Sequence, residues 1–312
     1  MEAATAPTLY FFGVNTAGSA MMQIFPKWAK ALELEDARLV GWDFALNDNP
    51  KRYREAVRFI KQDPLSRGAL ITSHKLNVVE AARDLFDELD AFGDMMSEVS
   101  CISKHGHVLS GTAVDPITSG IALHTFLPAD HWETTAAEVL ILGAGGAAVA
   151  LSWFLMHEER GCNHPHHIHI TDIDAGRLEH MRRIHESFPI RIPVSYHLMQ
   201  PEQTADELIA ALPPHSLVVN ATGMGKDRPG SPLSDAARWP EFGYAWELNY
   251  RGERHFLKQA EAQQESKSLI VRDGWLYFIY GWARVISEVF QVNIPFESDR
   301  FERLSELALE NR

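Results

Sequence analysis

The sequence predicts an α/β protein, and two features of its pattern support this class. Along the first half, short apolar segments of strand length alternate with longer segments whose apolar residues recur at helical spacing. Further along, the apolar run 139–142 leads directly into a glycine-rich turn, which is followed by an apolar segment that suits a helix, 149–156. Such alternation is typical of helices that cover a parallel or mixed sheet.

The composition narrows the kind of protein. The chain has 312 residues, which is enough for two domains of ordinary size. Its formal net charge of −13 argues against a nucleic-acid partner, which needs a basic face, and against docking on an anionic membrane. With only two cysteines, no disulfide framework is predicted. The N-terminus lacks a signal-peptide pattern and no apolar run reaches membrane-spanning length, so we expect a cytoplasmic protein.

The first half is predicted to form one α/β layer. Strands are predicted where short apolar segments end at turn residues, at 8–14, 38–44 and 68–72. Helices are predicted between and after them, at 21–34, 51–63, 78–90 and 116–126. Two short segments, 98–103 and 108–114, flank a hairpin-like turn at 105–107.

The second half is predicted to form a further sheet and the closing helices. Its buried strands are predicted at 139–142, 168–171, 217–220, 244–248 and 268–271. A long, aromatic-rich helix is predicted at 274–290 and an amphipathic helix at 301–309.

The glycine-rich turn has the spacing of a dinucleotide-binding fingerprint, Gly143-x-Gly145-x-x-Ala148. Gly143 permits the tight turn, Gly145 lets the backbone approach a pyrophosphate, and Ala148 lets the helix pack closely on the strand. The start of that helix presents free N–H groups to the anion. Because a strand and a helix flank the turn, we expect it to bind a nucleotide; the alternative is a glycine-rich turn without a ligand.

The choice of cofactor is predicted from the end of the next strand. An acidic residue at this position accepts hydrogen bonds from the ribose 2′-OH of NAD and repels the 2′-phosphate of NADP. Asp172 occupies it here, with Asp174 as a second candidate and Arg177 behind both. We therefore favour NAD over NADP. The alternative is that Asp172 only caps the following helix.

Hydride chemistry needs a group that takes up or supplies the hydroxyl proton of the substrate. The first half offers Lys75 and Asp115, each at the end of a predicted strand. A lysine acts as a base when burial or neighbouring charges lower its pKa, and a nearby carboxylate would hold it in place. Taken singly, each residue is more often simply solvated.

Six segments, in this order along the chain, resemble the shikimate/quinate dehydrogenase family. The matching segments are Gly13–Ser19, Thr72–Lys75, Gly111–Asp115, Leu142–Ala147, Asn220–Gly225 and Asp273–Gly274. The resemblance covers nearly the whole chain. It implies an N-terminal α/β substrate domain, a Rossmann NAD(P)-binding domain, and C-terminal helices that return to the substrate domain. We place the substrate domain at 1–125, completed by 273–312, and the nucleotide domain at 126–272.

The resemblance also implies roles for residues that match the family's motifs. Lys75 and Asp115 would form the catalytic pair of an NAD(P)-dependent dehydrogenase that acts on a CH–OH group. The residues implied in substrate binding are Ser19, Thr72, Ser100 and Tyr277. Those implied in cofactor binding are Gly143, Ala144, Gly145, Gly146, Ala147, Asp172, Asn220, Thr222, Gly223 and Met224.

Several departures from the family pattern concern the substrate. Met21 stands where the family's entry loop usually has a second serine, and Ser100 and Ala113 replace two asparagines. Gly281 falls near the position of a glutamine that usually touches substrate. Because a buried polar site discriminates strongly through such partners, we expect a related cyclic hydroxy acid or polyol in place of shikimate.

Two other functions stay open at this point. A nucleotide-binding or sensing protein of the same fold that has lost the reaction would explain the reduced polar shell. A methyltransferase is the weaker alternative, since a glycine loop followed by an acidic strand end also suits S-adenosylmethionine. For partners we expect a small molecule, with no nucleic acid and no membrane, and we consider a homodimer.

A cluster of histidines around Pro165 invites a metal hypothesis. It consists of His164, His166, His167 and His169. Zinc sites usually draw their ligands from separated pairs at fixed spacing, often with cysteine, and no second pair stands out. We therefore assign no metal site and interpret the cluster as a surface loop entering a strand.

Overall fold

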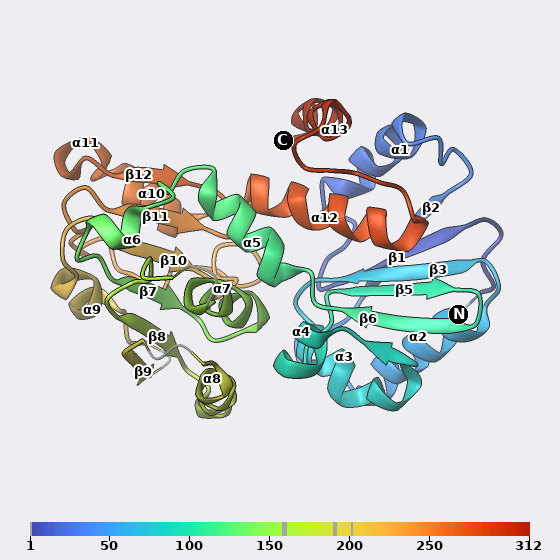
Figure 1. Cartoon of the computed structure of the whole chain (residues 1–312), viewed down its shortest axis with the longest axis horizontal. Coiled ribbons are helices and arrows are strands. Elements are labelled where there is room, and N and C mark those ends of the chain that lie inside the picture. Colours follow the sequence, from blue (N-terminus) through green and yellow to red (C-terminus); the bar gives the residue numbers. More distant parts are fainter. Residues whose placement is uncertain (1, 158–160, 190–191, 201) are drawn as a thin grey trace. The chain divides into compact units, whose positions relative to one another are not determined.

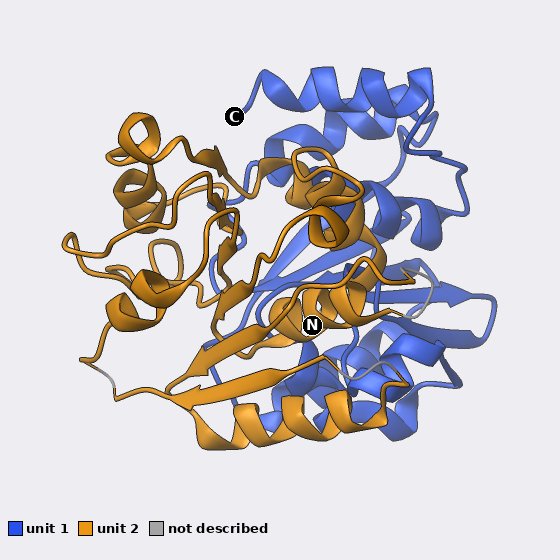
Figure 2. Ribbon diagram, turned by 60° about the vertical axis from the view of Figure 1, so that its left-hand side comes forward, with its two compact units in different colours: residues 1–115, 279–312 blue, residues 116–278 orange. Residues whose placement is uncertain are grey.

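The computed structural model describes residues 2–157, 161–189, 192–200 and 202–312, and the chain divides into two compact units. Unit 1 comprises residues 1–115 and 279–312, and unit 2 comprises residues 116–278 (Figure 2). Each unit contains a six-stranded sheet with helices, so the predicted α/β class is confirmed. Along the part of the chain that the structure describes, no helix combines the length and apolarity needed to cross a membrane.

The sheet of unit 1 is mixed, in the order β2-β1-β3-β5-β6-β4 (Figure 1). Its strands are β1 (Thr8–Gly13), β2 (Arg38–Asp43), β3 (Ser66–Ile71), β4 (Glu88–Leu89), β5 (Cys101–His105) and β6 (Val108–Thr112). The first three strands are parallel, whereas β5 runs antiparallel to both β3 and β6. The tight hairpin between β5 and β6 turns at Gly106, whose φ is +64°.

Helices cover both faces of this sheet. They are α1 (Met21–Ala31), α2 (Pro50–Gln62), α3 (Lys75–Ala82), α4 (Ala91–Met96) and α13 (Asp299–Leu309), with the greater part of α12 (Trp275–Phe290). Helix α2 begins where Asn49 accepts a hydrogen bond from Lys51 N (3.0 Å) ahead of Pro50, a favoured first helical residue. The buried side chains of α2 recur at helical spacing and pack with Phe12 of β1.

The sheet of unit 2 is parallel throughout, in the order β12-β11-β10-β7-β8-β9. Its strands are β7 (Val139–Leu142), β8 (Ile168–Asp172), β9 (Val194–Leu198), β10 (Leu217–Asn220), β11 (Tyr244–Glu247) and β12 (Ile270–Arg272). The accompanying helices are α5 (Asp115–His124), α6 (His131–Thr134), α7 (Gly146–Met156), α8 (Ala175–Ser187), α9 (Asp206–Ala211), α10 (His255–Glu261) and α11 (Gln264–Lys267). This is the strand order of the doubly wound dinucleotide-binding fold.

The strand order positions a binding site. Strand β7 lies between β8 and β10, so the chain leaves β7 and β10 toward opposite faces of the sheet. In open parallel sheets a crevice forms at this reversal, outside the carboxyl ends of the strands. The segments at that edge are the glycine loop after β7 and the loop that begins after Asn220 of β10.

Three local predictions differ from the structure. The helix predicted at 78–90 ends at Ala82, and β4 follows at 88–89. Tertiary contacts override helix formation there, because Asp87 accepts a hydrogen bond from Leu109 N (2.8 Å) and thereby ties the segment to β6. The short segment noted at 98–103 becomes a strand only from Cys101, where β5 begins. Strand β9 is absent from the sequence predictions.

The units divide at 115/116 and 278/279, whereas the sequence-based domain limits lie at 125/126 and 272/273. Apart from its first residue, Asp115, helix α5 falls in unit 2, because Gly120 lets it approach Phe154 of α7; a Cβ on Gly120 would lie 2.1 Å from that ring. The first turn of α12 also falls in unit 2, where Tyr277 packs edge-on against Trp246 (centroids 6.0 Å apart).

Candidate functional site

The glycine loop between β7 and α7 contains one glycine that no larger residue could replace and another that is surrounded by open space. Gly143 has φ +101°, and a Cβ there would lie 2.9 Å from the carbonyl oxygen of Ala221. A Cβ on Gly145, by contrast, would meet no atom of the described structure within 4 Å. Ala148 is fully buried where α7 meets the sheet. Gly143 therefore makes the turn, and Gly145 leaves room beside the backbone.

The start of α7 suits an anion. Gly145 is its N-cap, and in the described structure no side chain caps the helix. The first N–H groups of α7, from Gly146 and Ala147, lie in half-buried positions with the positive end of the helix dipole. The open space beside Gly145, the first backbone N–H groups of α7 and the N-terminus of this 11-residue helix together fit a pyrophosphate.

Asp172 lies beside this loop at the carboxyl end of β8. One carboxylate oxygen accepts a hydrogen bond from Ala144 N (2.8 Å), and the other accepts one from Asp174 N (2.9 Å). Helix α8 is capped by Asp174, which accepts from Gly176 N at 2.8 Å. The alternative that Asp172 is merely the helix cap is therefore wrong.

The loop after β10 is organised by Asn220. The side-chain oxygen of Asn220 accepts hydrogen bonds from the Thr222 hydroxyl (2.7 Å) and from Thr222 N (3.2 Å). Met224 N donates to the same hydroxyl at 3.0 Å, while Gly223 takes a φ of +74°. The predicted cofactor residues of this segment thus form one hydrogen-bonded turn at the switch point of the sheet.

A buried acid to which the sequence analysis gave no role also lies at the carboxyl ends of these strands. Glu247, at the end of β11, accepts hydrogen bonds from Asn220 Nδ2 (2.8 Å) and Asn249 N (2.9 Å). Burial raises the pKa of Glu247 to about 7, although both hydrogen bonds oppose the shift. The available signal was an acid at the carboxyl end of a predicted buried strand.

In unit 1 the two predicted catalytic residues form an ion pair. Lys75 begins α3 and Asp115 begins α5, 40 residues apart in sequence, and Nζ of Lys75 donates to Oδ2 of Asp115. Only 11% of the lysine side chain and 7% of the aspartate side chain are exposed. The residue before Lys75 is anchored too, since His74 is buried and its Nδ1 lies 2.9 Å from the Tyr53 hydroxyl.

Glu98 is a second acid near the pair, and the sequence analysis gave it no role. Its side chain is fully buried, and neither carboxylate oxygen has a hydrogen-bond partner among the described residues. Burial raises the pKa of Glu98, and the nearby charge of Lys75 acts in the opposite direction. The buried lysine therefore has one carboxylate that it contacts and another that interacts with it electrostatically.

The four predicted substrate residues are held in different ways. Ser100 is committed to the backbone, since its hydroxyl accepts from Val114 N at 2.8 Å and donates to Thr112 O at 3.4 Å. The Thr72 hydroxyl donates to Phe12 O (3.1 Å). Ser19 accepts from Met21 N (3.3 Å) at the start of α1.

Ser19, Thr72 and Ser100 belong to unit 1, with the ion pair, whereas Tyr277 belongs to unit 2. Ser100 braces the segment directly before Asp115. Its hydrogen bonds therefore support the acid of the pair.

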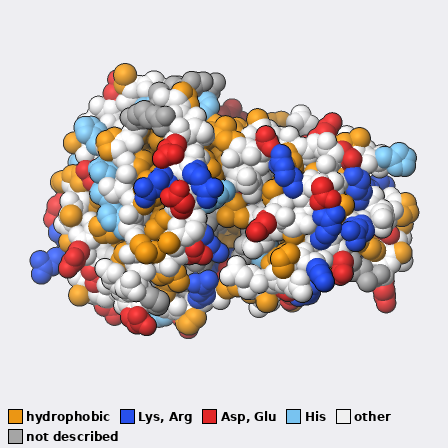
Figure 3. All heavy atoms as spheres, turned by 90° about the horizontal axis from the view of Figure 1, so that it is seen from below, with side chains coloured by type: hydrophobic (Ala, Val, Ile, Leu, Met, Phe, Trp, Pro, Cys, Tyr) orange, Lys and Arg blue, Asp and Glu red, His pale blue; other side chains and the backbone are white. Residues whose placement is uncertain are grey.

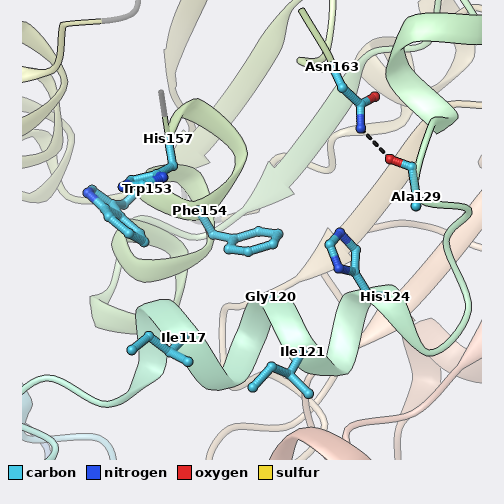
Figure 4. Close-up of a pocket in the computed structure, with 9 residues that line it drawn as sticks. All are labelled: Ile117, Gly120, Ile121, His124, Ala129, Trp153, Phe154, His157 and Asn163. Atoms are coloured by element: carbon cyan, nitrogen blue, oxygen red, sulfur yellow. Dashed lines mark hydrogen bonds between the residues drawn. The ribbon is translucent and has the colours of Figure 1, made fainter. Parts of the chain in front are cut away.

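A pocket of about 460 Å³ lies elsewhere in unit 2, between α5 and α7 (Figure 4). Its lining is mainly apolar, with Trp153 and Phe154 facing Ile117 and Ile121 across it. Asn163 donates a hydrogen bond to Ala129 O at its rim. The lining includes none of the residues predicted for substrate or cofactor.

Comparison with known proteins identifies the fold. No family model matches the sequence, and no curated protein matches it. Shikimate 5-dehydrogenase from Thermus thermophilus, solved with NADP(H) and shikimate, is 23% identical (TM-score 0.67; 98% of this chain, 99% of that one). Quinate dehydrogenase from Corynebacterium glutamicum, solved with NAD, is 18% identical (TM-score 0.67; 98% and 99%).

A third solved structure has a similar fold and is named for a different substrate. Ligand-free 5-ketofructose reductase of Gluconobacter sp. strain CHM43 is 17% identical (TM-score 0.66; 98% of each chain). At these identities the likeness concerns the fold. The chain has the α/β fold of the shikimate and quinate dehydrogenases, so the resemblance found in the sequence is confirmed at that level.

Proposed function

We propose that this protein is an NAD(P)-dependent oxidoreductase that transfers a hydride between a nicotinamide and a ring-bearing alcohol or ketone. The observation that carries the proposal is the buried Lys75–Asp115 ion pair, because burying two charges is costly unless they are paired or used. The fit of the glycine loop to a pyrophosphate supports the nucleotide half. The solved dehydrogenases with this fold carry NAD or NADP by name.

In this proposal Lys75 moves the proton. When bound, the nicotinamide accepts or supplies the hydride at the carbinol carbon. In the reducing direction the ammonium group of Lys75 donates its proton to the developing alkoxide, and in the oxidising direction the neutral amine takes up the hydroxyl proton. Asp115 holds the amine in place and stabilises its charged form. Asp115 also offers an oxygen to a substrate hydroxyl.

NAD is the proposed cofactor. The carboxylate of Asp172 lies against Ala144 N, next to the first turn of α7, and it is oriented by Asp174 N. A fixed negative charge at this strand end accepts hydrogen bonds from a ribose diol and disfavours a 2′-phosphate.

The proposed substrate is a cyclic hydroxy acid or polyol other than shikimate. Ala113 and Gly281 offer no side-chain hydrogen bond at two positions where the family has amides. The Ser100 hydroxyl is already engaged with the backbone, so it adds little to substrate recognition. A substrate with fewer or differently placed hydroxyls, or with a more apolar ring, should therefore be preferred.

A panel assay tests the function directly. The full chain is incubated with NAD or NADP and a series of cyclic polyols and hydroxy acids, shikimate and quinate included, and reduction is followed at the nicotinamide absorbance. We expect turnover with NAD on at least one ring substrate. Tight binding of NAD without turnover on any of them would favour the alternative, a nucleotide-binding protein that has lost the reaction.

A calorimetric titration with NAD, NADP and S-adenosylmethionine completes that test. Binding of NAD in preference to S-adenosylmethionine is expected. The reverse preference would overturn the proposal in favour of a methyltransferase.

A further inference from the structure

A group of polar side chains lies at the amino ends of two strands of unit 2. Glu138 directly precedes β7, His167 directly precedes β8, and His169 is the second residue of β8. In the parallel register Leu140 is the partner of His169, and side chains two apart along a strand share a face. All three side chains therefore lie on one face of the sheet, at the end opposite to the glycine loop.

Their ligand atoms converge. Oε2 of Glu138 lies 3.1 Å from Nε2 of His169, and one ligand atom from each of the three side chains lies within 4.8 Å of the other two. The rings of His167 and His169 have centroids 4.2 Å apart and planes 9° apart. The three side chains are partly exposed, so solvent ions can reach them. Figure 3 shows several histidines on the left-hand part of one face of the molecule.

Strand β9 supplies a partner for each imidazole. Nδ1 of His169 lies 3.2 Å from Nε2 of His197, and Nε2 of His167 lies 2.8 Å from the Ser195 hydroxyl. Histidines that bind a metal through one nitrogen almost always have the other nitrogen engaged in a hydrogen bond, which fixes the tautomer and the ring orientation. Both histidines meet this condition.

Hydrogen bonding alone explains part of the arrangement. A chain in which His197 donates to His169, and His169 donates to Glu138, satisfies these groups without an ion. This chain leaves out His167, although one of its ring nitrogens also lies within 4.8 Å of the ligand atoms of Glu138 and His169. Among the described residues, this is also the one group of three potential metal ligands.

We propose that Glu138, His167 and His169 bind a divalent transition-metal ion of the zinc class, with His197 and Ser195 orienting the two imidazoles. Two imidazole nitrogens and one carboxylate oxygen form a donor set that suits Zn²⁺, with a water molecule in the fourth position. This revises the sequence interpretation of the histidine cluster as a plain surface loop. The third ligand, which the local sequence pattern does not indicate, is Glu138, the residue directly before the neighbouring strand β7.

Binding requires a small rearrangement. Donor atoms of a tetrahedral zinc site lie about 3.3 Å apart, given bonds of about 2.0–2.1 Å, so the Glu138–His169 pair at 3.1 Å is nearly in place. Because the two rings lie nearly parallel, the ring of His167 must tilt relative to that of His169 for both to direct a nitrogen at one ion. The ion then joins the segments that precede β7 and β8, and it stabilises unit 2 by mass action.

The test is calorimetric titration of chelator-treated full chain with Zn²⁺, together with Co²⁺ absorption spectra. We expect one site per chain, with the visible bands of tetrahedral Co²⁺. His169→Ala and His167→Ala should each weaken this site by about 100-fold, and His197→Ala by about 10-fold.

The matched control is His255→Ala. His255 and Glu253 form another histidine–glutamate pair at 3.1 Å in unit 2, but on an exposed surface. This variant should leave the site unchanged.

A second measurement guards against misfolding of the alanine variants. Zn²⁺ should raise the Tm of the wild type and of His255→Ala, but not that of His169→Gln, which keeps a polar group in the strand. Equal Zn²⁺ affinity and Tm shift in the wild type and both His169 variants would overturn the proposal. A titration in which the wild type shows no single saturable Zn²⁺ site would also overturn the proposal.

Discussion

The two regions assigned to chemistry are built by different means. In unit 2 the glycine loop is set by backbone: Gly143 takes a left-handed φ that forbids a side chain, and α7 presents its amides. In unit 1 the pair Lys75–Asp115 is set by side chains brought together across 40 residues and buried. A backbone site can be recognised from local sequence, whereas a buried charge pair depends on the whole fold around it.

The two units also differ in how burial shifts the pKa of a titratable side chain. In unit 2, His185 lies buried between the Ser152 hydroxyl (2.8 Å from Nε2) and the Tyr196 hydroxyl (2.7 Å from Nδ1). Burial lowers its pKa from 6.5 to about 4. In unit 1, burial raises the pKa of Glu98. The two groups therefore act on stability in opposite directions as pH changes.

The largest predicted effect on stability concerns His185. Its folded pKa is depressed, so the unfolded chain binds the proton more readily, and stability falls as pH drops from about 6.5 toward 4. The difference between these two pKa values corresponds to about 3 kcal/mol. Chemical denaturation at a series of pH values should show that His185→Gln loses less stability than the wild type over this range. Parallel pH profiles for the two proteins would contradict the assignment.

Glu98 should behave in the opposite way. Its folded pKa is raised, so its contribution is most favourable at low pH and declines as pH rises above its ordinary value of 4.5. Because the carboxylate lacks hydrogen-bond partners among the described residues, Glu98→Leu should raise the free energy of unfolding at pH 7 by about 1–3 kcal/mol. Denaturation at pH 7 measures this. A less stable Glu98→Leu protein would mean that Glu98 is needed beside Lys75.

The smallest predicted effect tests the cofactor choice. Asp172→Asn keeps an oxygen that can accept from Ala144 N but removes the charge. The ratio of NAD affinity to NADP affinity should fall by about 10-fold, or about 1.4 kcal/mol. Asp174→Asn is the control, since it removes a charge two residues away and retains the helix cap. Equal changes in both variants would point to a general charge effect in place of a contact with the ribose.

The sequence predicted most strands correctly because they are continuous apolar runs, as in Val139–Leu142, and it placed the glycine loop directly after this strand, although the helix that follows begins at Gly146 and not at 149. Strand β9 was missed although Val194–Leu198 alternates apolar and polar residues, which is the pattern of a half-buried strand, because the prediction relied on continuous apolar runs. The helix predicted through 83–90 failed because the Asp87 side chain bonds to a strand neighbour. Local periodicity does not contain such a contact.

For the candidate sites the limit is similar. Lys75 and Asp115 could be offered as candidates from their places at predicted strand ends, the family resemblance implied that they form a catalytic pair, and the structure places their side chains in contact. Glu98 has no local signature, because its importance follows from complete burial, whereas Glu247 could have been noted as an acid at the carboxyl end of a predicted buried strand. The convergence of Glu138 with His169 follows from strand register, which composition cannot give.

The central claim is that Lys75 moves the proton and that the glycine loop separately holds the nucleotide. The most direct test is to measure the steady-state turnover and the NAD affinity of Lys75→Met. The control is Lys61→Met, which removes a more exposed lysine–aspartate pair of unit 1 (Lys61 to Asp87, 2.8 Å). With a substrate from the panel, Lys75→Met should lose turnover by about 10²–10⁴-fold while its NAD affinity stays within about twofold of the wild type. Lys61→Met should keep both. Full turnover in Lys75→Met would contradict the account.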